Sequence, residues 1–246
     1  MARTSNKLKF EPEIIIFDVD GVLVDVRGSF HQTVLETVKF FTGKRVTVQE
    51  LHRWKNRSGF NDDWRLSTAW VQSLGGKFEY DQVKRKFVEI YWGQNGGGNV
   101  AREKWLLPHA TLRRLAARAE LALFTGRVRA EIDYTLDRCN VREFFPQIVT
   151  VEDVKRPKPD PQGLLKILNG RDPSKSLYLG DNIDDAIASQ SAGIPFLGIL
   201  PCNSPRRTLL RKFGAEIILA DVRELETRLT RVMANRRSRA SVLPRA

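Results

Sequence analysis

Short apolar runs alternate with amphipathic stretches over the second half of the chain, from about residue 105 onward. Such alternation predicts strands that connect through helices into a mostly parallel sheet. The predicted strands span residues 13–18, 120–124, 147–150, 176–180, 195–199 and 216–219. The pattern therefore predicts an α/β fold in which helices flank the sheet.

The first and second predicted strands are separated by roughly 90 residues, far more than one crossover connection needs. Apolar side chains in this stretch recur at helical spacing, as in Phe30, Val34, Val38 and Phe41. We therefore expect an inserted, all-helical domain. The predicted organisation is a core of residues 1–25 and 106–233, a helical insertion of residues 26–105, and a basic, flexible tail of residues 234–246.

The composition is that of a globular protein, with 246 residues, 41% hydrophobic and 28% charged. Cys139 and Cys202 stand alone, without the spacing of a metal site or of a disulfide framework. No apolar run reaches the roughly 20 residues that span a bilayer, and the first residues lack the apolar stretch of a signal peptide. We therefore expect a cytoplasmic protein with no membrane partner.

The net charge of +12 raises the question of nucleic-acid binding. Eight of these positive charges lie in residues 1–10 and 231–246, which contain no acidic residue, and only +4 is left for the body. The end of the chain is rich in Arg, Ser and Ala, which is typical of a solvated tail. Nucleic acid is therefore not the expected partner.

Asp18 and Asp20 lie two positions apart at the end of the first apolar run, and Gly21 follows. Side chains alternate along a strand, so both carboxylates can project toward one point. Ligands of open parallel sheets bind at the carboxyl ends of the strands, where these residues fall. Taken alone, the pair fits a surface turn equally well.

Three further strand ends favour a functional reading. Thr125-Gly126-Arg127 follows the second strand, where a hydroxyl and successive main-chain N–H groups can hold an anion. A proline-stiffened loop containing Arg156 and Lys158 follows the third strand. An acidic cluster that runs from Asp181 to Asp185 follows the fourth.

With all four motifs present in this order, the chain resembles the haloacid dehalogenase superfamily from residue 14 to about residue 196. The resemblance implies a Rossmann-like core. The helical insertion resembles the cap of the subgroup that includes phosphoglycolate phosphatases. By this resemblance, Asp18 is the nucleophile that forms a phosphoaspartyl intermediate, and Asp20 is the general acid and base.

The resemblance also implies a magnesium site. Asp181 resembles the direct metal ligand and Asp185 the residue that supports it, while Asp18 and the main-chain carbonyl of Asp20 complete the expected site. Oxygen ligands without His or Cys favour Mg²⁺ over Zn²⁺.

Phosphate binding is expected from Thr125, the main-chain N–H of Gly126, and Arg127. The family's lysine is placed at Lys158, because that alignment puts a lysine at the head of Lys158-Pro159-Asp160-Pro161. Arg156 remains a neighbour that could assist it.

In the cap, the segment 57–65 is the candidate for contact with the leaving group, through Asn61 and Trp64. An ordinary helix-capping turn is an equally good interpretation of that segment.

The leading hypothesis is a Mg²⁺-dependent phosphatase that hydrolyses a small phosphorylated metabolite. Dehalogenases of the superfamily lack an aspartate at the position of Asp20, which argues against carbon–halogen cleavage. A phosphomutase shares every core residue and is kept as the alternative, and an inactive nucleic-acid-binding protein ranks last. The sequence decides neither the substrate nor whether the protein is a monomer or a dimer.

Overall fold

The computed structural model describes residues 11–57, 60 and 62–229. The chain divides into two compact units. The core unit contains the described residues up to Leu23, then Leu106–Asp181, and those from Asp185 onward; the inserted unit contains Val24–Trp105 and Asn182–Asp184. The basic tail predicted for residues 234–246 lies outside the described residues.

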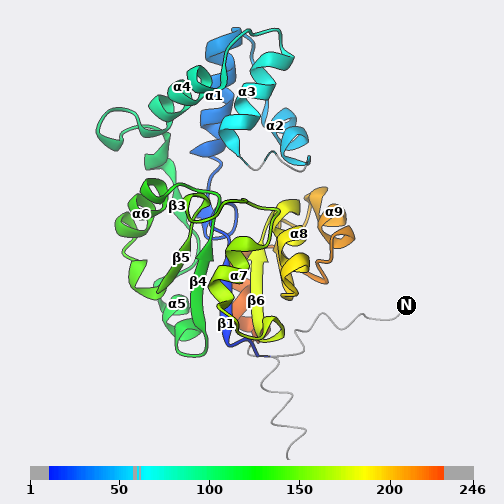
Figure 1. The fold of residues 1–246 in the computed structure, drawn as a ribbon. Coiled ribbons are helices and arrows are strands. Elements are labelled where there is room, and N and C mark those ends of the chain that lie inside the picture. The colour runs from blue at the N-terminus through cyan, green and yellow to red at the C-terminus, as the bar shows by residue number, and fades with distance from the viewer. Residues whose placement is uncertain (1–10, 58–59, 61, 230–246) are drawn as a thin grey trace, which may run out of the picture. The chain divides into compact units, whose positions relative to one another are not determined.

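The core unit is built on a six-stranded sheet in which every pairing is parallel (Figure 1). Its strands are β1 (Ile14–Phe17), β4 (Glu120–Phe124), β5 (Gln147–Val149), β6 (Ser176–Gly180), β7 (Phe196–Ile199) and β8 (Ile217–Leu219). Their order across the sheet is β5-β4-β1-β6-β7-β8. The prediction of a Rossmann-like, parallel α/β core is confirmed.

Helices flank this sheet, as Figure 1 shows. They are α5 (His109–Ala116), α6 (Arg129–Arg138), α7 (Gln162–Leu168), α8 (Ile183–Ala192) and α9 (Arg206–Lys212). Short 3₁₀ turns lie at Arg142–Phe144, Val151–Asp153, Pro173–Lys175 and Val222–Glu224.

Strand β1 is the centre of the sheet, because it pairs with β4 on one side and with β6 on the other. All four of its residues are buried, as expected for a strand covered on both faces. Its last residue, Phe17, pairs with Leu123 and with Leu179. This register brings the carboxyl ends of three strands to one edge of the sheet.

The described residues of the inserted unit form the helices α1 (Phe30–Thr42), α2 (Val48–Lys55), α3 (Asp63–Ser73) and α4 (Tyr80–Trp92), with 3₁₀ turns at Gln94–Gly96 and Asn99–Arg102. Asp62 caps α3 by accepting hydrogen bonds from the main-chain N–H groups of Trp64 and Arg65. The unit also contains a short antiparallel pair, β2 (Val24–Asp25) with β3 (Lys104–Trp105). The hydrophobic pattern did not predict this pair, because two-residue strands are too short to show a period.

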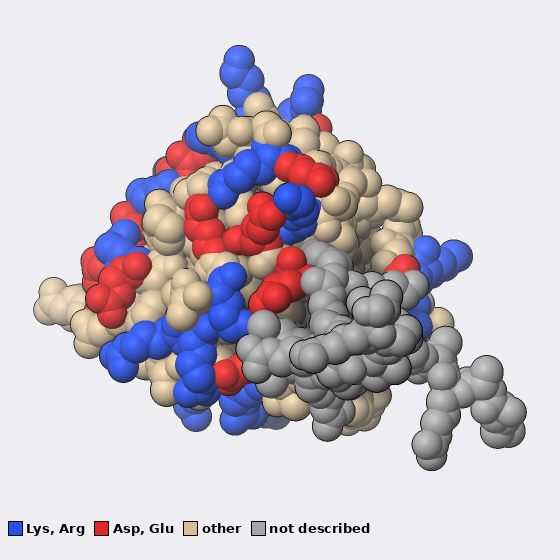
Figure 2. Space-filling model, turned by 90° about the horizontal axis from the view of Figure 1, so that it is seen from below, with Lys and Arg blue, Asp and Glu red and all other residues tan. Residues whose placement is uncertain are grey.

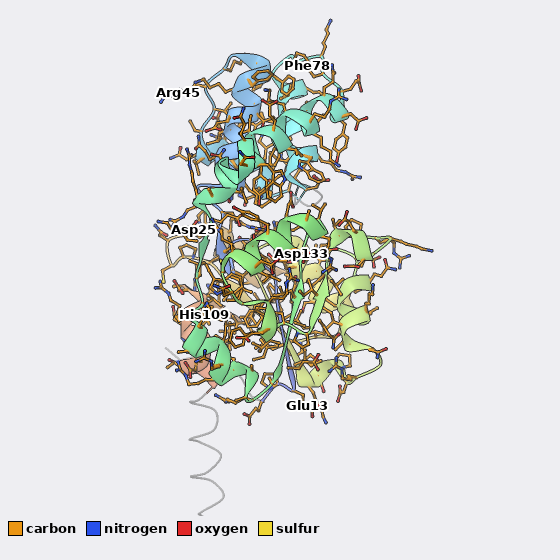
Figure 3. The ribbon with its side chains drawn as sticks, turned by 90° about the vertical axis from the view of Figure 1, so that its left-hand side faces the viewer. Glu13, Asp25, Arg45, Phe78, His109 and Asp133 are labelled. Carbon is orange, nitrogen blue, oxygen red and sulfur yellow. The ribbon has the colours of Figure 1, made fainter. Side chains whose placement is uncertain are left out.

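Aromatic side chains fill the interior of the inserted unit (Figure 3). The ring of Phe30 stacks on that of Tyr91, with centroids 4.5 Å apart, and Phe87 stacks on the other members of this group. Phe30, from the helical pattern in the sequence, thus contributes to a packed core. Within the described residues, no helix is both long and apolar enough to span a membrane.

Helix α7 offers a direct test of the packing. Leu164 is fully buried in a hydrophobic cluster with strand residues such as Ile16 and Phe124. The next residue, Leu165, is 49% exposed. We expect Leu164→Ala to lower the free energy of unfolding by about 2–5 kcal/mol, because it removes buried methyl groups and leaves a cavity. Leu165→Ala is the matched control and should cost less than about 1 kcal/mol. Urea denaturation measures both, and equal losses would contradict this packing of α7.

Candidate active site

The candidate site lies where β1, β4 and β6 end. Asp18 follows β1 directly, and its main-chain N–H donates to the carbonyl of Leu179 at 2.8 Å. Thr125 follows β4, and Asp181 follows β6. The register of the sheet therefore brings Thr125 and Asp181 to the same edge as Asp18, although both follow it by more than 100 residues.

Three carboxylates converge at this edge. Asp18, Asp181 and Asp185 each offer an oxygen, and these oxygens lie within 4.8 Å of one another. Asp18 and Asp185 are buried, and Asp181 is partly buried. Carboxylate oxygens are the ligands that Mg²⁺ prefers, so the donor set fits that ion. The side chain of Asp20 is not in this group. Binding of the metal by the main-chain carbonyl of Asp20 stays a prediction.

The ammonium group of Lys158 lies between two of these carboxylates. Its Nζ is 2.8 Å from Asp18 Oδ1 and 2.8 Å from Asp185 Oδ1. Burial by itself lowers the pKa of Lys158, but attraction to the two carboxylates outweighs burial and raises that pKa above the ordinary lysine value. Lys158 is therefore charged at neutral pH.

The electrostatics of Asp18 favour a further cation. Burial raises the pKa of the Asp18 carboxyl well above its usual range; Lys158 lowers it, and the neighbouring acids Asp185, Asp20 and Asp181 raise it further. A divalent cation beside these carboxylates would lower the pKa of Asp18 again and stabilise the ionised form.

Tyr178, in β6, orients Asp185. Its hydroxyl donates to Asp185 Oδ1 at 2.6 Å, and the residue is fully buried. Burial, and then the charges of Asp185 and Asp18, raise the pKa of Tyr178 well above that of an ordinary tyrosine. The hydroxyl thus stays protonated at neutral pH and remains a hydrogen-bond donor to the carboxylate.

Two glycines allow the carboxylates to approach the main chain closely. Gly21 has φ +76°, and a Cβ atom there would lie 2.5 Å from Asp181 Oδ2. A Cβ atom at Gly180 would lie 2.6 Å from Asp185 Oδ2. Any larger residue would push a carboxylate out of the cluster, so both positions fit an oxygen cradle for a cation.

The segment after β4 places its three residues differently. Thr125 is buried, and its hydroxyl accepts a hydrogen bond from the main-chain N–H of Arg127 at 3.1 Å, whereas Gly126 is exposed. The guanidinium of Arg127 is buried and is bound to the side chains of Asp20 and Thr135. The expected contact of Arg127 with phosphate stays a prediction, but these hydrogen bonds of its guanidinium point to another role.

Three expected residues remain, namely Arg156, Trp64 and Asn61. Arg156 is exposed and pairs with Asp160 at 2.6 Å, so Lys158 is the cation of this loop that reaches Asp18. Trp64 lies in the inserted unit with the Nζ of Lys84 3.9 Å from its ring centroid. Asn61 lies outside the described residues.

Comparison with known proteins decides the family. The model of the haloacid dehalogenase-like hydrolases matches residues 15–199, which include all the carboxylates described above. The chain belongs to the haloacid dehalogenase-like hydrolase family. The resemblance expected from its four motifs is confirmed.

Individual relatives carry several different names. An imidazoleglycerol-phosphate dehydratase of Phytophthora nicotianae is 29% identical over 83% of this chain, which spans only 47% of that relative. A pyrophosphatase PpaX of Bacillus cereus is 32% identical over a region that spans 73% of this chain and 79% of that relative. A crystal structure of a predicted phosphoglycolate phosphatase from Haemophilus somnus has a TM-score of 0.72 at 20% identity. The match covers 89% of this chain and 98% of that one, which supports the fold.

Two contacts of this haloacid dehalogenase-like site were not found by reasoning from the sequence. The apolar pattern of residues 176–180 does not set Tyr178 apart, although this residue bears a hydroxyl three positions before Asp181. Arg206, in α9, donates from Nη2 to the carbonyl of Asp181 at 2.8 Å and lies 3.5 Å from its carboxylate. No spacing rule links Arg206 to the four motifs, because only the fold brings α9 to this edge.

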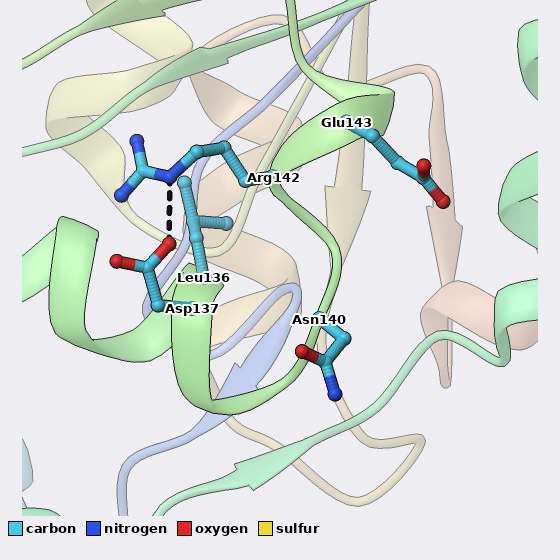
Figure 4. Close-up of a pocket in the computed structure, with 5 residues that line it drawn as sticks. All are labelled: Leu136, Asp137, Asn140, Arg142 and Glu143. Carbon is cyan, nitrogen blue, oxygen red and sulfur yellow. Dashed lines mark hydrogen bonds and ion pairs between the residues drawn. The ribbon is translucent and has the colours of Figure 1, made fainter.

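A separate surface pocket of about 380 Å³ lies at the end of α6 (Figure 4). It is lined by Leu136, Asp137, Asn140, Arg142 and Glu143. Arg142 is already paired with Asp137 at 2.7 Å and with Asp133 at 2.9 Å. None of the site residues described above lines this pocket, so we assign it no part in the chemistry.

Tyr178→Phe tests the support of Asp185. Because residues that orient metal ligands typically contribute 10- to 100-fold to affinity, we expect the apparent affinity for Mg²⁺ to fall roughly 10-fold. Titration of the melting temperature with MgCl₂ measures this change. Tyr134→Phe, a partly exposed tyrosine in α6, is the matched control. Identical Mg²⁺ curves for the two variants would show that the hydroxyl of Tyr178 does not support a metal site.

Proposed function

We propose that this chain is a Mg²⁺-dependent phosphatase that hydrolyses a small phosphorylated metabolite through a phosphoaspartyl intermediate on Asp18. The observation that carries the proposal is the buried carboxylate of Asp18, bound by Lys158 at 2.8 Å and grouped with two further carboxylates. Family membership supports the same chemistry. A location in the cytoplasm is part of this proposal.

The first step is the attack of the Asp18 carboxylate on phosphorus. The bond from phosphorus to the leaving oxygen breaks, and Asp20 gives that oxygen a proton. In the second step a water attacks the phosphoaspartate, Asp20 accepts its proton, and the bond to Asp18 breaks. Inorganic phosphate leaves, and both aspartates return to their initial state.

Cations offset the charge of the transferring phosphoryl group. Lys158 is held close enough to the nucleophile to neutralise the phosphoryl oxygens as they approach. Asp18, Asp181 and Asp185 would hold Mg²⁺, which when bound neutralises phosphate charge and positions the group for attack. Thr125 and the N–H of Gly126 are proposed to bind the phosphate oxygens.

The charge of the surface gives little support to a nucleic-acid-binding function. On the face drawn in Figure 2, lysines and arginines are interspersed with aspartates and glutamates. Several arginines of the core unit are engaged in ion pairs, as Arg142 is with Asp137 and Arg171 is with Glu120 at 2.8 Å. Such pairing reduces the positive potential that attracts a phosphate backbone.

Asp18→Asn tests the nucleophile. We expect hydrolysis of p-nitrophenyl phosphate in Mg²⁺ to fall roughly 10⁴-fold or more, because the amide cannot form the phosphoaspartate. EDTA should abolish the activity of the unmodified protein, and added Mg²⁺ should restore it. Release of p-nitrophenolate at 405 nm measures both effects.

Asp25→Asn is the matched control for this substitution. Asp25 lies seven residues further along the chain, and its carboxylate is bound to Arg27 in the inserted unit. Its activity should stay close to that of the unmodified protein. Turnover that survives both the chelator and Asp18→Asn would refute the mechanism.

A phosphomutase would use the same core residues and is separated by its product. With a sugar phosphate as substrate, we expect inorganic phosphate to appear in step with loss of the ester. Phosphorus NMR distinguishes this outcome from the formation of an isomer. An isomer formed without phosphate release would assign the chain to the mutases instead.

A further inference from the structure

The side chain of Arg127 is buried and bound on each of its three nitrogens. Nε and Nη2 donate to the same oxygen, Asp20 Oδ1, at 2.8 and 2.6 Å. Nη1 donates to Thr135 Oγ1 at 2.7 Å. The side chain of Arg127 is 1% exposed, whereas that of Asp20 is 35% exposed. The carboxylate thus faces solvent on one side and a fixed cation on the other.

Both the guanidinium and the main chain of Arg127 are held by hydrogen bonds. Thr135, in α6, donates its own hydroxyl hydrogen to the carbonyl of Glu131 at 3.1 Å, which turns an oxygen lone pair toward Arg127. At the other end, the main-chain N–H of Arg127 donates to Thr125, and its carbonyl accepts from Val151 at 3.3 Å. Arginine in such a setting fixes the orientation of a carboxylate, as a flexible lysine would not.

Two N–H donors on Asp20 Oδ1 determine which oxygen can carry a proton. A protonated carboxyl group has its hydrogen on one oxygen, and an oxygen that accepts two charged N–H donors is the less favourable position for it. Oδ2 is therefore the oxygen of Asp20 suited to exchange a proton with the substrate.

We infer that Arg127 is a positioning residue for proton transfer, which fixes Asp20 so that Oδ2 delivers the proton to the leaving oxygen and later takes one from water. This inference rests on the proposed phosphatase function. It gives Arg127 a role different from the phosphate contact expected from its sequence position, because its guanidinium is committed to Asp20 and Thr135.

The test compares two substrates that differ in their need for a proton. p-Nitrophenolate leaves without protonation, whereas the alkoxide of an alkyl phosphate such as glycerol 3-phosphate requires it. For Arg127→Gln, we expect kcat/KM for the alkyl ester to fall roughly 100-fold and that for p-nitrophenyl phosphate to fall only about 3-fold. Arg127→Lys keeps a charge near Asp20 and should recover part of the loss.

A matched control and a double substitution complete the experiment. Arg129→Gln removes an arginine two positions away, which is paired with Asp153 at 2.6 Å, and should change both substrates by less than about 2-fold. If Arg127 acts through Asp20, then adding Arg127→Gln to Asp20→Asn should cause little further loss with the alkyl ester.

Equal losses on both substrates, or full additivity with Asp20→Asn, would overturn the role of Arg127 while leaving the phosphatase function intact. An unmodified protein that releases phosphate from neither substrate would instead refute the proposed function and this inference with it. If Arg127→Gln fails to fold, Arg127→Lys provides the same comparison, with a smaller but still substrate-dependent loss expected.

Discussion

The contact on which the rest of the site depends is the ammonium of Lys158 between Asp18 and Asp185. The carboxylate oxygens of Asp18 and Asp185 lie within 4.8 Å of each other. Two buried carboxylates this close repel strongly in a medium of low dielectric constant. A buried charge is tolerated only when it is paired and hydrogen-bonded. Lys158 meets this condition for both acids at once and places a cation beside the proposed nucleophile. The Nζ of Lys158 lies 4.7 Å from the ring centroid of Phe124 and 5.5 Å from that of Tyr178, and the lysine side chain is buried.

The parallel sheet makes this contact possible. Lys158 and Asp18 are 140 residues apart, and local structure alone cannot bring them together. Because β1 is central and its neighbours run in the same direction, the residues after β1, β4 and β6 emerge at one edge. The glycines at 21 and 180 then let the carboxylates lie against the main chain. The pairing of these strands thus holds the carboxylates together although they repel one another.

The sequence predicted the strands well, because buried parallel strands appear as short apolar runs with clear boundaries. It also singled out Asp18, Asp181 and Asp185, since each belongs to a motif next to a strand end. Contacts between motifs were harder to foresee. Whether Arg127 faces a ligand or Asp20 depends on side-chain direction, and the approach of Arg206 to Asp181 depends on the path of a later helix. Neither direction nor path leaves a periodic signal in the sequence.

The three cations of the site differ in kind, and the difference matches what each carboxylate is proposed to do. Arg127 holds Asp20 through two N–H donors, and Arg206 binds the main-chain carbonyl of Asp181 and lies 3.5 Å from its carboxylate. A lysine point charge lies instead beside Asp18, where the phosphoryl group must arrive. If all are ionised, Asp18, Asp20, Asp181 and Asp185 exceed Lys158, Arg127 and Arg206 by one charge. These seven described groups taken by themselves thus nearly balance, and a bound divalent ion would make the set net positive. That excess favours binding of a dianionic phosphate ester, so Mg²⁺ would serve the substrate as well as the ionised form of Asp18.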